Sequence, residues 1–347
     1  MVKKMFSIEK RKISKNHNPL IIPEIGINHN GKIDVAFKMV DAAKRAGAEI
    51  VKHQTHIPEE EMSLEAKKIK PGNSNKNIYS IIEKCTLSEE DEYKLFKYVQ
   101  KKNMIFLSSP FSKKAVDRLN KFGVSSFKIG SGEFNNIHLL DYITRFKKNI
   151  VLSTGMHDLK TVIKIYKFLI KKKSNFCFLH TTSLYPTPDY LVRLNAIQEM
   201  KDNFKNIEIG YSDHTLGITA CLSAISLGAN IIEKHFTDTK QRSGPDIICS
   251  MDEKELKKII NESKRIFDFK KGGKIFLKSE QVTRDFAFAS VVSIKNIKKN
   301  EKFDQFNIWI KRPGTGDFKL DQLKNLYKKK AKSNISKNTQ IKKHHVY

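Results

Sequence analysis

The sequence predicts a (β/α)8 TIM barrel followed by a small C-terminal domain. Over residues 19–267, eight short β-branched runs alternate with longer amphipathic stretches. Strict alternation of this kind implies parallel strands joined by right-handed crossovers, and eight such units need a chain of about this length. A doubly wound open sheet is the alternative. It is weakened because no Gly-x-Gly-x-x-Gly run follows the first strand.

The expected elements follow one another in a regular order. Residues 1–19 are expected to form an N-terminal hairpin that caps the barrel floor, and residues 20–270 the barrel itself. Gly47, Gly123 and Gly228 end helical patterns, where a left-handed residue is needed. The eight expected strands cover residues 20–27, 49–54, 104–109, 124–129, 149–153, 176–181, 207–212 and 230–236.

A change in composition marks the end of the barrel. Residues 271–283, which begin with a run of lysine and glycine, are expected to form a linker. Residues 284–347 then make a small domain, with strands expected at 286–294 and 307–311.

The charge balance is strongly basic. The 347 residues carry 65 lysines and arginines against 37 acidic residues, a net charge of +28. The lysines are scattered over helical segments and are not interleaved with aromatic residues, so we do not expect a nucleic-acid groove. Hydrophobic residues make up 39% of the chain, enough for a sizeable core, which excludes wholesale disorder.

Cysteine spacing and apolar runs indicate the compartment. The four cysteines lie far apart with no Cys-x-x-Cys pair, which argues against a zinc knuckle and against a disulfide framework. The N-terminus lacks the apolar core of a signal peptide, and the longest apolar stretch, residues 220–232, is too short to span a bilayer. We expect a cytoplasmic protein that binds neither nucleic acid nor membranes.

Polar residues collect at the C-terminal ends of the expected strands, where TIM barrels place their active sites. A charge inside an apolar strand is costly unless it points at a partner. Lys52 and Lys128, with Ser109, Ser131 and Ser153, therefore suggest a seat for a small anion with more than one negative charge. The alternative is that each lysine only pairs with a carboxylate, from Glu24, Glu133 or Glu233.

Two histidines end the last two strands. The imidazoles of His214 and His235 could share a divalent ion and leave positions open for substrate or water. A hydrogen-bonded histidine pair is the alternative. Glu24 and Glu133 are the candidates for general acid–base chemistry.

Nine short motifs, in order along nearly the whole chain, resemble those of the sialic acid (N-acetylneuraminate) synthase family, in its bacterial type with a C-terminal antifreeze-like (SAF) domain. They are residues 23–31 (PEIGINHNG), 52–56 (KHQTH), 127–133 (FKIGSGE), 152–156 (LSTGM), 184–188 (LYPTP), 212–215 (SDHT), 233–237 (EKHFT), 244–246 (GPD) and 311–314 (KRPG).

The resemblance implies a transferase that condenses phosphoenolpyruvate with N-acetylmannosamine and water to give N-acetylneuraminate and phosphate. It implies that His214 and His235 hold a divalent metal, Mn2+ or else Mg2+ or Co2+, which polarises the sugar aldehyde. Glu133 matches a glutamate that the family needs for catalysis. The phosphate and carboxylate seat matches Lys52, Lys128, Ser109, Ser131 and Ser153, and sugar-contacting or supporting positions match Glu24, Gln54, Asn73, Tyr185, Glu233 and Asp246.

The resemblance also implies a homodimer. In the family, each small domain covers the active site of the partner, and Arg312 matches an arginine that reaches the N-acyl group from that domain.

A few positions depart from the family pattern. Ser183 stands where relatives usually carry asparagine, Phe134 replaces a cysteine, and Ser109 replaces a threonine. Family members that make legionaminic or pseudaminic acid from related amino sugars tend to lack the histidines at positions 53 and 56. His53 and His56 therefore favour N-acetylmannosamine here, with those related sugars as the alternative.

Overall fold

A computed structural model describes residues 5–71 and 75–347, so the predicted site residue Asn73 lies outside the described part. The chain forms two compact units, one extending to Lys271 and the other running from Gly272 to Tyr347. Each unit is described below by itself.

The first unit contains the predicted TIM barrel. Eight parallel strands close in the order β10-β3-β4-β5-β6-β7-β8-β9, and pairing from Ile231 with Leu20 to His235 with Glu24 joins the last strand to the first. All eight strands lie within two residues of their predicted limits. They are β3 (Leu20–Gly26), β4 (Ile50–Thr55), β5 (Ile105–Pro110), β6 (Ser126–Ile129), β7 (Asn149–Ser153), β8 (Phe176–Thr181), β9 (Glu208–Asp213) and β10 (Ile231–His235).

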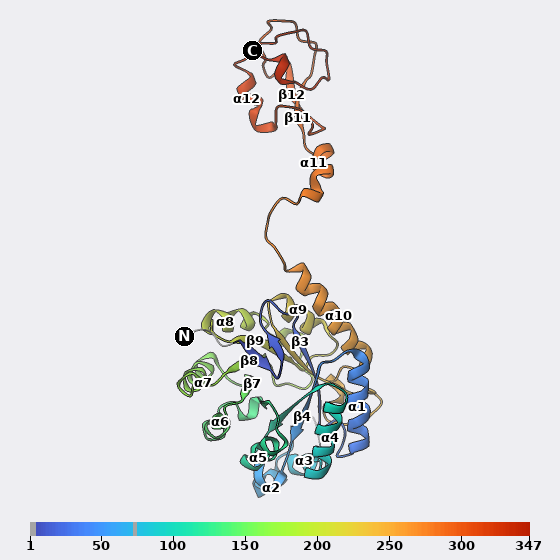
Figure 1. The fold of residues 1–347 in the computed structure, drawn as a ribbon, viewed down its shortest axis with the longest axis vertical. Coiled ribbons are helices and arrows are strands. Elements are labelled where there is room, and N and C mark those ends of the chain that lie inside the picture. The colour runs from blue at the N-terminus through green and yellow to red at the C-terminus, as the bar shows by residue number, and fades with distance from the viewer. Residues whose placement is uncertain (1–4, 72–74) are drawn as a thin grey trace. The chain divides into compact units, whose positions relative to one another are not determined.

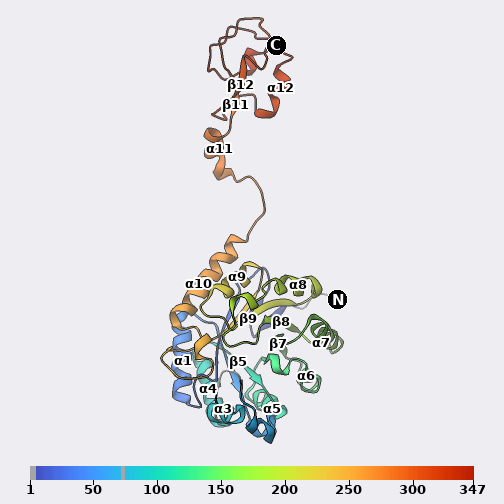
Figure 2. The same ribbon diagram turned by 180° about the vertical axis from the view of Figure 1, so that it is seen from behind.

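Helices surround these strands in both views of the molecule (Figures 1 and 2). Several begin at a side chain that accepts a backbone N–H, as Asp158 and Asp252 do, and Gly47 and Gly123 end helices with left-handed φ values of 93° and 86°. The helices are α1 (Ile33–Ala46), α2 (Pro58–Glu61), α3 (Ile78–Cys85), α4 (Glu89–Lys101), α5 (Lys113–Phe122), α6 (Ile137–Thr144), α7 (Leu159–Lys171), α8 (Asn195–Asn203), α9 (Thr219–Ser226) and α10 (Glu253–Phe269).

The inward faces of the strands change from apolar to polar along their length. On β4, for example, Ile50 is followed two and four residues later by Lys52 and Gln54, and residues two apart share one face of a strand. The apolar inward residues near the strand starts pack against the antiparallel pair β1 (Phe6–Ile8) and β2 (Arg11–Ile13). The hairpin closes that end of the barrel, and the polar side chains lie at the other end.

The second unit has its own core, formed by residues that include Val291, Phe303 and Ile341. Its sheet pairs β11 (Ser290–Ser293) with β12 (Ile308–Lys311) in antiparallel register. It also contains α12 (Leu323–Leu326). Its assignment as an antifreeze-like (SAF) domain stays a prediction.

The start of this unit differs from the sequence prediction. Residues at the end of the predicted linker and at the start of the predicted strand 286–294 form a helix, α11 (Gln281–Ala287). Glu280 accepts the backbone N–H of Leu277 just before it, and no proline or glycine interrupts the following seven residues. The strand is therefore shorter than predicted.

Among the described residues, no helix combines the length and the apolar character needed to cross a membrane.

Candidate active site

A cavity of about 400 Å³ opens at the C-terminal ends of the barrel strands. Adjacent strands place their last inward side chains around it, because each strand turns every second residue to the barrel interior. The predicted site residues that line it are Lys52, Gln54, Ser109, Lys128, Ser131, Ser153, Tyr185, His214, Glu233, His235 and Asp246. A larger hollow of about 1150 Å³ lies between α7 and α8, away from these residues.

Two lysines and two glutamates form a buried charge cluster at the floor of the cavity. Lys128 Nζ lies 3.3 Å from Glu233 Oε1, and Lys52 Nζ lies 3.8 Å from the same oxygen and contacts Glu24. Burial opposes ionisation of Glu233, but the two lysines outweigh it and lower its pKa. The lysines therefore pair with Glu24 and Glu233, and no ion pair joins either of them to Glu133 among the described residues.

Hydroxyl groups lie beside this cluster. Lys128 Nζ donates to Ser153 Oγ at 2.8 Å, and Ser131 Oγ accepts the backbone N–H of Gly155 at 3.0 Å. The buried hydroxyl oxygens of Ser109 and Ser183 have no hydrogen-bond partner in the described structure. Unpartnered buried hydroxyls in the same cavity as two lysine side chains are suited to an oxyanion. Ser183, the position that departs from the family pattern, thus also lines the cavity.

His214 and His235 lie side by side, with ring centroids 5.4 Å apart. His214 Nδ1 is 2.8 Å from the backbone oxygen of Thr182, so it carries the proton and Nε2 keeps a lone pair. His235 Nδ1 is buried without a hydrogen bond, 3.7 Å from a carboxylate oxygen of Asp246. Burial lowers the pKa of His214 to about 4 and that of His235 well below its ordinary value. Both rings are neutral at pH 7.

Neutral imidazoles with available ring nitrogens are the form in which histidine binds metals. The described residues contain no group of three or more histidine, cysteine or carboxylate side chains arranged around one metal position. The pair fits a cation that has two protein ligands and takes its other ligands from substrate or water.

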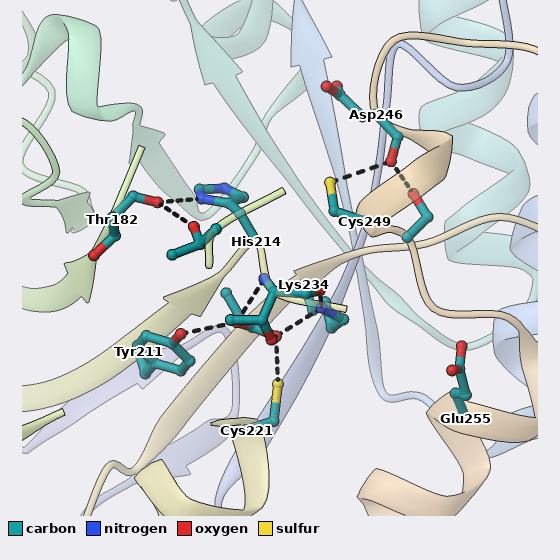
Figure 3. Close-up of polar contacts among 12 residues, drawn as sticks. Thr182, Tyr211, His214, Cys221, Lys234, Asp246, Cys249 and Glu255 are labelled. Carbon is teal, nitrogen blue, oxygen red and sulfur yellow. Dashed lines mark hydrogen bonds and ion pairs between the residues drawn. The ribbon is translucent and has the colours of Figure 1, made fainter. Parts of the chain in front are cut away.

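An ion pair lies on the outer face of the two strands that lead to the histidines, and Figure 3 shows the contacts of one of its partners, Lys234. Asp213 and Lys234 each precede a histidine by one residue, and their charged atoms are 2.6 Å apart. Asp213 also accepts the backbone N–H and the hydroxyl of Thr215, and Lys234 donates to the backbone oxygen of Thr215. These bonds fix the backbone on both sides of His214.

The two histidines of the KHQTH run have different surroundings. His56 lines the cavity and stacks on Phe111, with ring centroids 4.3 Å apart. His53 is on the opposite face of β4, where its Nδ1 lies 3.3 Å from buried Glu92 and its Nε2 lies 3.2 Å from the Nε2 of His29. His53 is not among the cavity-lining residues, so it has no direct contact with a substrate there.

Two other predicted site residues of the barrel are also absent from the residues that line the cavity. Glu24 is buried below it, against Lys52. Glu133 lies in a 3₁₀ turn with Ser131, and its carboxylate accepts a hydrogen bond from Asn136 at 2.7 Å. Arg312 belongs to the second unit, where it is exposed just after β12.

Sequence reasoning missed one part of the cavity. Ile27 and three isoleucines of α3, Ile78, Ile81 and Ile82, line it as well. Their spacing along the chain is typical of any helix that faces a core, so it carried no signal for a site.

Comparisons with known proteins agree with this geometry. The model of the NeuB family matches residues 39–274. The chain is 39% identical over 305 residues to the N,N'-diacetyllegionaminic acid synthase of Campylobacter jejuni, covering 86% of this chain and 91% of that protein. It is 34% identical to the pseudaminic acid synthase of the same species, covering 85% and 88%.

A solved structure is similar too. The N-acetylneuraminic acid (sialic acid) synthetase of Leptospira borgpetersenii, in complex with citrate, superposes with a TM-score of 0.73 and is 31% identical. The match covers 81% of this chain and 95% of that one. The chain belongs to the NeuB family, and it is an enzyme of the sialic acid synthase type, a transferase that forms a carbon–carbon bond.

Proposed function

We propose that this enzyme condenses phosphoenolpyruvate with a 6-deoxy-2,4-diacetamido sugar and water, and releases phosphate and a legionaminic-type acid. The observation that carries the proposal is the meeting, in one cavity, of two buried lysines, unpartnered serine hydroxyls and a neutral histidine pair. In the proposed reaction, C3 of phosphoenolpyruvate bonds to the aldehyde carbon of the sugar. Water adds at C2, and phosphate then leaves from C2.

The side of the cavity that holds the buried charge cluster is the proposed binding site of phosphoenolpyruvate. Lys52 and Lys128 line the cavity and share Glu233 as a partner. Burial lowers the pKa of Lys52 to about 7, and the carboxylate of Glu233 favours its charged form. Ser109 and Ser183 offer hydroxyls without partners, and Ser131 and Ser153 add two more. Charge-assisted hydrogen bonds of this kind are stronger than neutral ones and suit a phosphate and a carboxylate.

A divalent cation is part of the proposal. Mn2+, with Mg2+ or Co2+ as alternatives, would be held by His214 and His235 and would supply Lewis-acid polarisation of the sugar aldehyde. The available nitrogens of the two rings and the nearby carboxylate of Asp246 support this choice of site.

Acid–base groups come from the carboxylates near the cavity. Burial raises the pKa of Asp246 to about 6, and this side chain lines the cavity. Glu133, predicted as a general acid–base residue, accepts a hydrogen bond from Asn136 and is not among the residues that line the cavity, so its catalytic role stays a prediction. Glu24 supports Lys52 from below.

The choice of sugar follows the relatives. The legionaminic acid synthase is 39% identical, against 31% for the N-acetylneuraminic acid synthetase. The earlier preference for N-acetylmannosamine rested on His53 and His56, and His53 faces away from the cavity. N-Acetylmannosamine remains the second candidate, because the similar solved structure belongs to an enzyme named for N-acetylneuraminic acid.

We further propose that the enzyme works as a homodimer in which the C-terminal unit, as an antifreeze-like domain, covers the partner's cavity and contributes Arg312. An exposed arginine at the end of β12 in a unit of only 76 residues supports this arrangement, since such a small unit buries little surface alone.

The test of the substrate is a comparison of kcat/KM for a 6-deoxy-2,4-diacetamido hexose and for N-acetylmannosamine, at saturating phosphoenolpyruvate and with Mn2+ present. The proposal expects the diacetamido sugar to be favoured at least tenfold. A preference for N-acetylmannosamine would move the assignment to the second candidate.

A further inference from the structure

One side of the cavity is apolar. Asn77 begins α3 by accepting the backbone N–H of Ser80, and the helix then places Ile78 and, one turn later, Ile81 and Ile82 on one side. These three side chains and Ile27 line the cavity, and we call them the isoleucine wall. They pack with Met62 and Cys85 in a small cluster that is separate from the main barrel core. Ile78 and Ile81 are only half-buried, so each keeps apolar surface available.

The order of the strands fixes where this wall lies relative to the anion seat. Ile27 follows β3 and α3 follows β4, whereas Ser153 ends β7 and Ser183 follows β8. In the closed barrel, β3 is four strands from β7 in either direction, and β4 is four strands from β8. The isoleucine wall therefore faces Ser153 and Ser183 across the mouth, whereas Lys52 on β4 and Ser109 on β5 lie on the wall's own side.

The polar groups beside the wall are already paired with one another. Gln54 donates to Glu24 at 3.2 Å, and its oxygen lies 2.9 Å from His56 Nε2. The other nitrogen of His56 lies 2.9 Å from Glu61. Among the described residues that line the cavity, the buried polar atoms without a partner belong to Ser109, Ser183, Glu233 and His235. None of these four comes from β3, β4 or α3.

The wall thus offers apolar contact and few free hydrogen-bonding groups. If phosphoenolpyruvate occupies the side of Lys128, Ser153 and Ser183, the sugar presents its aldehyde carbon there, and the other end of the open chain extends toward the opposite side. A hydroxyl at C6 would lose its bonds to water against the isoleucines, whereas a methyl group would gain contact.

We propose that the isoleucine wall receives the C6 end of the sugar and selects a 6-deoxy substrate over the same sugar with a C6 hydroxyl. The inference rests on the proposed function, and it adds the residues that distinguish a methyl group from a hydroxymethyl group at C6 of the sugar. Ile78 and Ile81, with apolar surface still exposed, contribute most of the selectivity.

The test uses two aldehyde substrates that differ only at C6: 2,4-diacetamido-2,4,6-trideoxyhexose and 2,4-diacetamido-2,4-dideoxyhexose. The ratio of their kcat/KM values in the wild-type enzyme is expected to favour the 6-deoxy sugar by roughly tenfold or more, the scale of a methyl group in an apolar pocket. The double variant Ile78→Ser with Ile81→Ser should lower this ratio at least fivefold, mainly through the 6-deoxy sugar. Ile78→Val with Ile81→Val should keep it.

Ile170→Ser is the matched control, because Ile170 is a partly exposed isoleucine of α7 that does not line the cavity, and it should leave the ratio unchanged. The wild-type ratio requires no variant to fold. Equal kcat/KM values for the two sugars, or an unchanged ratio of these values in the serine variant, would contradict selection by the isoleucine wall. Either result would leave the proposed function in place. No turnover of either diacetamido sugar would overturn both.

Discussion

Asp213 and Lys234 form a fully buried ion pair, 2.6 Å apart, on the outer face of the two strands whose next residues are His214 and His235. Because successive strand residues point to opposite faces, the pair lies outside the barrel while the histidines lie inside. Tyr211 donates a further hydrogen bond to Asp213. The ion pair thus joins the ends of β9 and β10, next to the two histidines, and it does so without any ligand.

Loss of one partner of this pair should destabilise the protein. Lys234→Met leaves a buried carboxylate without its countercharge, and we expect the free energy of unfolding to fall by about 3–5 kcal/mol. Lys240→Met removes a half-exposed partner of Glu255 and should cost ~0–1 kcal/mol. Urea denaturation of both variants measures the difference. Equal losses would mean that the pair contributes no more than a surface contact.

The pH dependence of stability should change sign in the same variant. In the wild type, burial disfavours ionised Asp213, but the ammonium of Lys234 outweighs burial and lowers the pKa of Asp213 below its ordinary value. The ionised Asp213 therefore contributes to the free energy of unfolding above the pKa that it has in the unfolded chain. This contribution is lost as the pH falls through its lower pKa in the folded protein. Without Lys234, we expect burial, the largest influence on Asp213, to raise its pKa despite the hydrogen bonds from Thr215 and Tyr211, so that stability is lost as the pH rises. Melting curves of Lys234→Met against wild type between about pH 2 and 7 test this reversal, with the wild-type loss expected below about pH 4.

Removal of Lys128 should weaken the capture of phosphoenolpyruvate. A hydrogen bond to a charged group contributes about 1.5–3 kcal/mol, so Lys128→Met should raise KM for phosphoenolpyruvate roughly 10- to 150-fold. Lys147→Met, an exposed lysine after α6, is the control and should leave KM unchanged. An unaltered KM in the first variant would reduce Lys128 to a structural partner of Glu233.

The histidine pair should bind the metal. His214→Ala and His235→Ala are expected to abolish Mn2+ binding in calorimetry and metal-dependent turnover, while circular dichroism stays like that of wild type. His138→Ala, an exposed histidine on α6, should bind Mn2+ normally. The metal assignment is wrong if chelation and both substitutions leave the rate within about threefold, which is roughly 0.6 kcal/mol of barrier.

The strand ends and the anion seat could be predicted because they follow from local pattern. Alternation along β4 and β6 fixes which side chains turn inward, so Lys52 and Lys128 could be placed at the mouth from the sequence. Which carboxylate each lysine meets depends on neighbours far along the chain. Glu233 lies more than 100 residues from Lys128, and only the closed sheet brings the two together.

Other features could not be predicted, because their sequence patterns also occur in segments that have no role in a binding site. The isoleucines of α3 have the spacing of a core helix, and only the structure shows that Ile78 and Ile81 line a cavity. The outward orientation of His53 follows from the alternation along β4, but its partner Glu92 belongs to α4, and only the folded chain brings the two together. The helix α11 was predicted as linker and strand, since its short, mixed composition lacks a clear period.

The role of Arg312 can be tested by rescue between two inactive variants. If Arg312 acts on the partner's cavity, unfolding and refolding His235→Ala together with Arg312→Ala should restore about one quarter of the sites, since half of the dimers are mixed and each has one intact site. Each variant refolded alone is the control. Mixed dimers without activity would show that the arginine serves its own barrel or does not reach the chemistry.

The most direct measurement of the central claim is phosphate release from phosphoenolpyruvate by the purified full chain, with and without a 6-deoxy-2,4-diacetamido hexose. We predict release that requires the sugar, stops on chelation and returns with Mn2+, together with one nine-carbon acid formed per phosphate. Release that does not depend on any amino sugar, or no release with either this sugar or N-acetylmannosamine, would contradict the account.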